Sequence, residues 1–460
     1  MRPLRASAAL ALAVSVAFAC GGDDETPAPS ATPDAGIAPG PDASAGDDGG
    51  WTTPDAGADG AVDATPDAPP PFEPAWFALN HVLSTGQSLS VGSQGTPILS
   101  TTQPFENVMF VTGVRAGGTG LTSFVPLVET GVETMSAGMS SLITDLARND
   151  TLKGKPAPKN DHRLLVSCHG VGGTAYVGLK KGTVAYQNGM AQVTAGMALA
   201  KAASLTYVVR AVTNVHGESD HVAMNATYEQ DLVDWQKDYE TDVKAATGQT
   251  EPIPMFHTQM SSWTKYGQAT SAIPQAQLDA STKSGGKIVM VGPKYFLSYV
   301  ADGVHLSAQG YRHMGEYYAK AYRRVVLEGK AWEPVRPKTV TLAGDTIRVV
   351  FHVPTPPLVF DTTLVAAAAN RGFEYTDDSG APPAIASVAL DGPDAVTIKL
   401  AAAPSAAAKK RVRYAFTGVA GATGGPTTGA RGNLRDSDAT PSRNGSPLWN
   451  WAVHFDAPVP

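Results

Sequence analysis

Between residues 76 and 333 the sequence alternates short apolar runs with longer segments of helical character. The runs that favour strands are 76–83, 107–112, 163–168, 205–212, 253–258 and 287–292. The intervening segments that favour helices are 132–149, 187–203, 226–247 and 307–328. Strands that alternate with helices of this length are typical of a parallel sheet with helices on both faces. The sequence therefore predicts a three-layer α/β/α domain over residues 73–333.

The pattern changes after residue 333. Runs such as KTVTLAGDTIRVVFHVP and IASVALDGPDAVTIKLAA are rich in β-branched residues, contain turn signals and have no helical stretch. Such a pattern favours short antiparallel strands. We expect residues 334–460 to form a small all-β sandwich, either as a separate accessory domain or as a closely packed appendage.

The first twenty residues, MRPLRASAALALAVSVAFAC, have the pattern of an export signal. Two arginines precede an apolar run from Ala6 to Ala19, which is shorter than the roughly 20 residues that cross a bilayer. Residues 17–20, AFAC, resemble a loose lipobox, and they also satisfy the A-x-A rule of ordinary signal cleavage. We expect a lipoprotein signal with lipidation at Cys20 and a lipid-anchored envelope or surface protein. Ordinary export to the periplasm or medium is the alternative.

Residues 21–72 are rich in Pro, Gly, Ala and Asp and contain almost no bulky apolar side chain. Such a segment cannot bury enough surface to offset its ordering entropy, so we expect a disordered acidic linker. Residues 21–75 carry twelve acidic residues and no basic one, and they account for the formal net charge of −7. The rest of the chain is close to neutral, which does not favour a nucleic-acid partner. Membrane contact is expected only through a lipid at Cys20.

Cys168 is the only other cysteine of the chain. If Cys20 is lipidated, no disulfide can form. Because Cys168 ends an apolar run, we expect it to be a buried small hydrophobic residue.

Three residues form a candidate catalytic set. Ser88, in STGQSLSVG, directly follows the first predicted strand, and ligands bind at the carboxyl ends of parallel strands. Asp302 and His305 stand three residues apart in a loop before a predicted helix. A carboxylate beside the imidazole Nδ1 fixes the tautomer and leaves Nε2 to take a proton from a hydroxyl. A turn serine, a loop aspartate and a capping histidine are the alternatives.

Two further stretches follow predicted strands. In VSCHGVGGTAY (166–176), amides around Gly173 can donate to an oxyanion, although an ordinary glycine turn is the alternative. AVTNVHGESDH (211–221) is densely polar, and four of its side chains are possible zinc ligands: His216, Glu218, Asp220 and His221. No distal ligand motif accompanies them, so we favour a polar site loop and expect no metal.

Taken together, the blocks at the ends of these strands resemble the SGNH hydrolases, and within them the sialate-O-acetylesterase-type branch of carbohydrate esterases. The resemblance covers roughly residues 76–332 and implies a flavodoxin-like sheet. The blocks that carry it stand in order along the chain: GQS (86–88), GGT (172–174), HGESD (216–220) and DGVHL (302–306). GNLRDSD (432–438) and LWNWAVHF (448–455) resemble a module that follows such esterase domains.

The resemblance assigns Ser88 as nucleophile, His305 as general base and Asp302 as its orienting carboxylate. It implies oxyanion donors at the amides of Ser88 and Gly173. The third donor departs from the family pattern, because His216 stands where glutamine is usual and Asn214 where tryptophan is usual. We expect His216 to donate, or Asn214 if the register differs. Three residues would hold the loop and the donor in place: Gln87, Glu218 and Asp220.

The sequence as a whole predicts a serine esterase that is exported, uses no cofactor and hydrolyses acetyl or other short acyl esters. Acylated carbohydrate is the substrate that the resemblance implies. A conventional α/β-hydrolase would need G-x-S-x-G, which neither residues 86–90 nor residues 217–221 provide. An alternative from a different class is a catalytically inactive surface protein that binds polysaccharide on the same scaffold.

Overall fold

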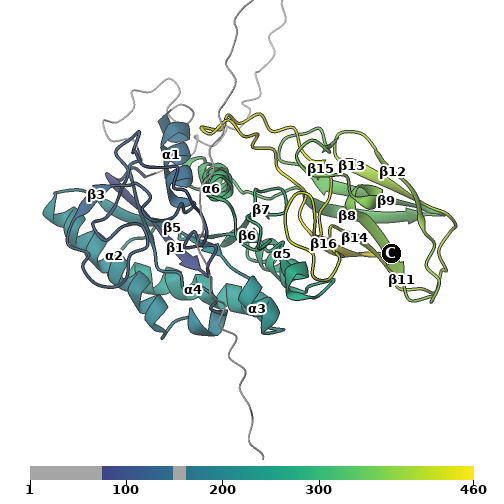
Figure 1. Cartoon of the computed structure of the whole chain (residues 1–460), viewed down its shortest axis with the longest axis horizontal. Helices are drawn as coiled ribbons and strands as arrows, with labels where there is room; N and C mark the ends of the chain where they lie inside the picture. The colour runs from purple at the N-terminus through teal and green to yellow at the C-terminus, as the bar shows by residue number, and fades with distance from the viewer. Residues whose placement is uncertain (1–74, 149–161) are drawn as a thin grey trace, which may run out of the picture. The chain divides into compact units, whose positions relative to one another are not determined.

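The computed structural model describes residues 75–148 and 162–460 (Figure 1). The predicted signal with Cys20 and the predicted linker over residues 21–72 lie outside the described residues. Within the described ranges, no helix is long and apolar enough to cross a membrane.

A seven-stranded sheet forms the centre of the α/β region, in the order β3-β2-β4-β1-β5-β6-β7. Its strands are β1 (Leu79–Gly86), β2 (Val108–Phe110), β3 (Phe124–Pro126), β4 (Leu164–Cys168), β5 (Tyr207–Val215), β6 (Met255–Gln259) and β7 (Ile288–Pro293). All neighbours pair in parallel except β3, which runs antiparallel to β2. The neighbouring strands β4-β1-β5-β6-β7, renumbered 1 to 5 by their order along the chain, have the order 2-1-3-4-5 of flavodoxin-like sheets. The predicted strands are all present, whereas β3 was not predicted.

Helices cover both faces of this sheet, which confirms the predicted three layers (Figure 1). On one face lie α1 (Ser136–Leu146) and α6 (Ala308–Tyr322). On the other lie α2 (Val184–Ala202), α4 (Tyr228–Thr247) and α5 (Ile273–Lys283). The shorter elements are α3 (Glu218–Val222), η2 (Tyr176–Gly178), η3 (Trp263–Tyr266), η5 (Ala369–Gly372) and the π-helical η4 (Arg323–Leu327). Helices α3 and α5 were not predicted.

Local signals fix several helix ends. The Thr183 side chain caps α2, and the Ser307 side chain caps α6 by accepting from the Gly310 amide at 3.1 Å. Helix α4 ends at Thr247 and is followed by Gly248, whose φ of +72° is the left-handed conformation that glycine adopts without strain. With Ser307 as its cap, α6 starts at Ala308, three residues after His305.

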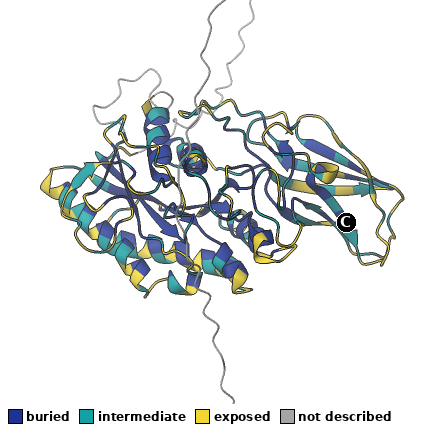
Figure 2. Ribbon diagram, in the orientation of Figure 1, coloured by how far each residue is buried: buried dark blue, intermediate teal, exposed yellow. Residues whose placement is uncertain are grey.

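The central strands are buried along both faces (Figure 2). Alternate β1 side chains enter different clusters: Val82 joins the one built with α1 and α6, and Leu83 the one built with α2 and α4. Because both faces are covered, every residue of β1 is buried, including the polar Asn80, His81, Ser84 and Thr85.

All strand pairs described in the C-terminal region are antiparallel, as expected for an all-β fold, and the region also contains the short 3-10 helix η5. A four-stranded sheet contains β8 (Arg336–Ala343), β9 (Thr346–His352), β12 (Ile385–Leu390) and β13 (Ala395–Leu400). A three-stranded sheet contains β11 (Phe373–Asp377), β14 (Lys410–Tyr414) and β16 (Phe455–Val459), and β10 (Val359–Phe360) pairs with β15 (Leu434–Arg435). Phe351 of β9 packs against Phe373 and Phe455 of the three-stranded sheet, so the two larger sheets form a sandwich.

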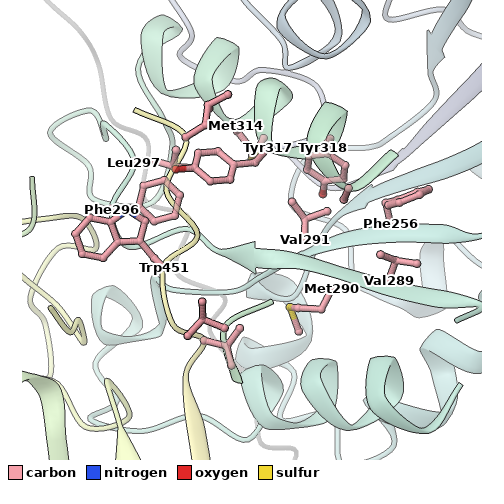
Figure 3. Close-up of a cluster of buried hydrophobic side chains, with 14 of the residues drawn as sticks. Phe256, Val289, Met290, Val291, Phe296, Leu297, Met314, Tyr317, Tyr318 and Trp451 are labelled. Carbon is pink, nitrogen blue, oxygen red and sulfur yellow. The ribbon is translucent and has the colours of Figure 1, made fainter. Parts of the chain in front are cut away.

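The β region and the α/β region share one hydrophobic cluster (Figure 3). Trp451 stacks on Phe296, with ring centroids 5.7 Å apart and an interplanar angle of 14°. The Gln259 side chain donates to the His454 carbonyl at 2.8 Å and accepts from the His454 amide at 2.8 Å. The segment that precedes β16 is therefore built into the α/β core.

Candidate active site

The turn after β1 presents Ser88 at the carboxyl end of the sheet. Gly86 ends the strand with a φ of +123°, and a Cβ there would overlap the Val215 carbonyl, so only glycine fits. The chain then turns, and the Ser93 amide donates to the Ser88 carbonyl at 3.0 Å. Ser88 is half-buried, and no helix begins in this turn for it to cap.

Ser88, His305 and Asp302 form a continuous chain of contacts. Ser88 Oγ lies 2.8 Å from His305 Nε2, and His305 Nδ1 lies 2.6 Å from Asp302 Oδ2. The other carboxylate oxygen accepts from the amides of Val304 and His305, each at 2.9 Å. With Nδ1–H donating to Asp302, Nε2 is free to accept the serine proton. The structure thus brings together the three residues predicted as the catalytic set.

The electrostatics of Asp302 suit the orienting role. Its partial burial alone would raise its pKa, but hydrogen bonds from the His305 ring and from the two amides hold the pKa of Asp302 below its usual range. The carboxylate therefore stays ionised and can stabilise an imidazolium at His305.

Gln94 also contacts this pair and was not predicted. Its side-chain amide donates to Asp302 Oδ2 at 2.6 Å and lies 3.4 Å from His305 Nδ1. Gln94 has a φ of +64°, in the turn that carries Ser88. It links the nucleophile turn to the carboxylate, and its only sequence signal is its place six residues after Ser88.

The glycine turn after β4 lies beside Ser88. The Val171 amide donates to the Gly86 carbonyl at 3.0 Å, which fixes the turn across the end of β1. A Cβ on Gly172 would lie 3.8 Å from the Ser88 Cβ, whereas one on Gly173 would meet open space. Among the described residues, the amides of Ser88, Gly172 and Gly173 have no protein acceptor. Unpartnered amides beside a serine are suited to receive an oxyanion.

His216 has partners other than an oxyanion. Tyr228 OH donates to His216 Nδ1 at 2.7 Å, and His216 Nε2–H donates to the Thr174 carbonyl at 3.0 Å. Burial lowers the pKa of His216, with Asp220 acting in the opposite sense, so the ring is neutral with one donor. That donor is already in use.

Asn214, the other residue considered for the third donor, lies inside β5. Its side-chain amide contacts Met255 Sδ at 3.8 Å, within the sheet. The one N–H of the His216 ring is in use, and the Asn214 side chain is buried within the sheet. His216 instead holds the carbonyl next to Gly173, so its contact is with the glycine turn.

The three residues predicted to hold the loop are all buried and bonded. Gln87 Oε1 accepts from the Ser219 amide at 3.0 Å. Glu218 pairs with Lys294 at 2.9 Å, and both side chains are fully buried. Asp220 accepts from the Tyr176 amide at 2.8 Å and from the Asn225 side chain at 2.6 Å. These contacts tie the loop after β5 to the turns after β1, β4 and β7.

The placement of His216 predicts unequal effects of two substitutions. His216→Gln is expected to keep ester hydrolysis within about tenfold of wild type, because a glutamine amide can still donate to the Thr174 carbonyl. His216→Ala leaves that carbonyl and Tyr228 unpaired and is expected to lower the free energy of unfolding by about 1–3 kcal/mol. Urea unfolding and kcat for an acetate ester measure the two effects. A loss of about 100-fold or more in kcat for both variants would instead make His216 an oxyanion donor.

The remaining sequence predictions concern a metal and Cys168. Within residues 75–148 and 162–460, no group of three or more His, Cys, Asp or Glu is arranged to hold a metal ion. Of the four considered, Glu218 is bonded to Lys294, and His221 Nδ1 lies 2.9 Å from Ser271 Oγ. Cys168 is buried and free, and burial raises the pKa of its thiol.

Comparison with known proteins gives a family match and a fold match. Residues 149–324 match the family described as "Carbohydrate esterase, sialic acid-specific acetylesterase", a segment that begins after the strand leading to Ser88. No curated protein matches the chain. A carbohydrate acetylesterase from Xanthomonas citri is similar in structure, with a TM-score of 0.53, 12% identity, and coverage of 82% of this chain and 80% of the other. At that identity the likeness supports the fold.

Two more solved structures are similar at lower scores. A protein from Arabidopsis thaliana has a TM-score of 0.40 at 16% identity, with 54% of this chain and 98% of the other covered. A carbohydrate acetylesterase from Sinorhizobium meliloti has a TM-score of 0.30 at 13% identity, with 52% and 97% covered. The match over residues 149–324 is to a family of carbohydrate esterases, and the fold is similar to that of a carbohydrate acetylesterase, so the protein is a carboxylic ester hydrolase.

Proposed function

We propose that this protein is an exported serine esterase that removes acetyl groups from carbohydrate through an acyl-enzyme on Ser88. The observation that carries the proposal is the contact chain from Ser88 Oγ to His305 and on to Asp302, at 2.8 and 2.6 Å, beside unpartnered amides. A serine hydroxyl is a weak nucleophile until a neighbouring base takes its proton. The chain of contacts supplies that base and fixes its tautomer.

In the acylation step, Ser88 Oγ attacks the ester carbonyl carbon while its proton passes to His305 Nε2. The carbonyl oxygen becomes an oxyanion and accepts hydrogen bonds from the unpartnered amides of Ser88, Gly172 and Gly173. The bond to the sugar oxygen then breaks, and that oxygen takes the proton from His305. The products are the free hydroxyl of the sugar and an acyl ester on Ser88.

In the deacylation step, water takes the place of the sugar. His305 removes a proton from the water, whose oxygen attacks the acyl carbon, and the same amides receive the second oxyanion. The bond to Ser88 Oγ breaks, and the proton returns from His305 to Ser88. Asp302 stays ionised throughout and stabilises the transient imidazolium.

Carbohydrate as the substrate is supported by the description of the matched family and by the openness of the site. Ser88 is half-buried, and the side chains of His305 and Asp302 remain 19% and 29% exposed. A nucleophile near the surface accepts a small acyl group carried on a bulky alcohol such as a sugar chain. Residues 302–306, DGVHL, lie within the matched segment 149–324.

Export is supported by the signal pattern of residues 1–20 and the lipobox-like residues 17–20. Such a signal would place the esterase outside the cytoplasm, where acetylated polysaccharides occur as substrates. Labelling of the full chain with a palmitate analogue in a bacterial host tests the anchor. Label that persists in Cys20→Ser would reject lipidation at this residue.

The substrate proposal predicts a strong preference for short acyl groups. We expect p-nitrophenyl acetate to be hydrolysed with a kcat/KM at least about tenfold above that of the octanoate ester. In the proposed reaction most binding contacts are made with the sugar, so the part of the site that holds the acyl group need accommodate only an acetyl group. Acetate release from an acetylated xylan and from an O-acetylated sialic acid then identifies the sugar. Ser88→Ala, which lacks the proposed nucleophile, is the negative control in each assay.

Three outcomes are distinguishable. Acetate release that depends on Ser88 supports the proposal. A preference for octanoate would make the protein an esterase of another substrate class. A folded protein that binds these glycans without releasing acetate from any ester would be the catalytically inactive binding protein.

A further inference from the structure

A glycine-rich loop of the β region, residues 418–430, lies against the catalytic end of the α/β region. It connects β14 with β15 and contains five glycines. Four hydrogen bonds join it to the loops after β6 and β7: Gly418 N–H to the Ala269 carbonyl (2.9 Å), Gly421 N–H to the Thr264 carbonyl (2.7 Å), Thr264 Oγ1–H to the Ala422 carbonyl (2.8 Å) and Gly424 N–H to the Gly303 carbonyl (2.8 Å). The last of these reaches the residue after Asp302.

The contact at Gly303 is unusually close. Gly303 has a φ of +69°, and a Cβ there would overlap the Thr423 side chain. From the other side, a Cβ on Gly424 would lie 2.9 Å from the Gly303 carbonyl oxygen. Both positions must be glycine for the two backbones to approach. Gly425 continues the contact, because its Cβ would lie 3.3 Å from the Tyr299 ring.

The turn under this contact carries both Asp302 and His305. Its base is closed by an antiparallel bridge between Tyr299 and Leu306, and by the Val300 amide, which donates to the His305 carbonyl at 3.0 Å. Its tip is closed by the Gly303 amide, which donates to the Val300 carbonyl at 3.0 Å. The tip thus has two external supports, Gly424 on its backbone and Gln94 on the Asp302 carboxylate.

The glycine-rich loop is itself held in place by a hydrogen bond and by packing. Thr428 Oγ1 donates to the Thr423 carbonyl at 2.7 Å, and Ala430 is buried in the core cluster built with α2 and α4. A support that is anchored at both ends resists displacement, as a positioning contact must.

We infer that the glycine-rich loop is a positioning element of the active site: Thr423 and Gly424 hold the Asp302–Gly303 turn so that the carboxylate faces His305. The inference rests on the proposed function and deepens it, because it makes the β region a part of the catalytic unit. Small displacements of an orienting group have large effects on rate, since the reacting atoms must stay in attack geometry.

Gly424→Ala tests this directly, because its methyl group would press on the Gly303 carbonyl. We expect kcat for p-nitrophenyl acetate to fall by about tenfold to hundredfold with KM within about twofold of wild type. Thr423→Ala removes the packing without a clash and is expected to cause a smaller loss of kcat. This second variant keeps the test valid if Gly424→Ala does not fold.

Two substitutions serve as matched controls. Thr427→Ala alters an exposed residue of the same loop for which no contact with the catalytic turn is seen among the described residues. Gly117→Ala is an exposed glycine-to-alanine change at which the new Cβ meets nothing within 4 Å. Both are expected to keep kcat within about twofold of wild type.

A readout independent of turnover separates this inference from the proposed function. The His305 Nδ1 proton, hydrogen-bonded to Asp302, should give a downfield proton NMR resonance that disappears in His305→Gln. We expect the resonance to be weakened or shifted in Gly424→Ala and Thr423→Ala and unchanged in the controls. If wild type hydrolyses no ester, this comparison still decides the positioning role, and only the proposed function fails.

Two results would overturn the inference. The first is a folded Gly424→Ala variant with wild-type kcat and an unchanged His305 resonance. The second is a wild-type protein without the resonance, because the pair that the loop is inferred to hold would then not be formed.

Discussion

Ser88→Ala is expected to reduce kcat for acetate esters by at least about 10⁴-fold, to the residual level that binding and oxyanion donors supply on their own. The reason is geometric: Ser88 Oγ lies 2.8 Å from the base His305, with the unpartnered Gly172 and Gly173 amides alongside. Steady-state kinetics with p-nitrophenyl acetate, checked by a single-turnover burst, measure the loss. No burst of nitrophenol is expected from the variant.

The same substitution should leave the fold almost unchanged. Ser88 is half-buried, and among the described residues its hydroxyl contacts only His305, so the free energy of unfolding is expected to change by less than about 1 kcal/mol. Ser93→Ala is the matched control, because this half-buried serine shares the turn and no hydrogen bond of its hydroxyl is seen in the described part of the chain. Residual activity in Ser88→Ala within tenfold of wild type would place the nucleophile elsewhere.

The sequence was sufficient to predict the sheet, and the meeting of the candidate catalytic residues, for a common physical reason. Each chemical block directly follows an apolar run, and parallel strands gather their carboxyl ends at one edge of a sheet. Ser88 after β1, Gly173 after β4 and His305 after β7 were therefore expected to meet. The structure brings them to one edge, with the nucleophile and base in contact.

What could not be predicted depends on contacts between distant residues. The partners of His216 are Tyr228 and the Thr174 carbonyl, and neither is marked by a motif. Likewise, Gln94 meets Asp302 only because two turns converge. Helix α5, IPQAQLDASTK, has few apolar positions, so its sequence periodicity is weak although it packs on α4.

The glycine-rich loop illustrates a further limit of motif reasoning. Glycines in the sequence indicate a turn, but the closeness of Gly424 to Gly303 arises from packing between two regions. Residues 418–430 lie within residues 334–460, which were expected to form an all-β sandwich, and in the structure they form part of the connection between β14 and β15. Their contact with the turn after β7 links that sandwich to the site through the backbone.

The second large effect is a loss of stability, expected when Lys294 is replaced. Its ammonium group lies 2.9 Å from Glu218 Oε1, both side chains are fully buried, and Ser262 Oγ donates to the same oxygen at 3.0 Å. Lys294→Met leaves the Glu218 carboxylate buried without a compensating charge. Removing one member of a buried pair is expected to lower the free energy of unfolding by about 3–5 kcal/mol, measured by urea unfolding.

The difference in stability between wild type and Lys294→Met is expected to depend on pH. In wild type, burial alone would raise the pKa of Glu218, but Lys294 and the hydrogen bonds hold that pKa below its usual range. Wild type therefore loses this contribution only when the pH falls through the lowered pKa. In Lys294→Met burial prevails, the pKa of Glu218 rises, and stability is lost as the pH rises. The difference between the two proteins should thus be larger near about pH 8 than near about pH 5.

The matched control is the double variant Glu218→Gln with Lys294→Met, which removes both charges. Because no buried charge remains unpaired, we expect it to be more stable than Lys294→Met alone by about 1–3 kcal/mol, with little pH dependence of the difference from wild type. Additive losses in the double variant would show that the two groups do not interact.

Glu218 begins the short helix whose Ser219 amide donates to Gln87, so a displaced Glu218 should also lower kcat through the turn that carries Ser88. Loss of stability at Lys294 without any change in kcat would separate the folding role of the pair from the geometry of the site.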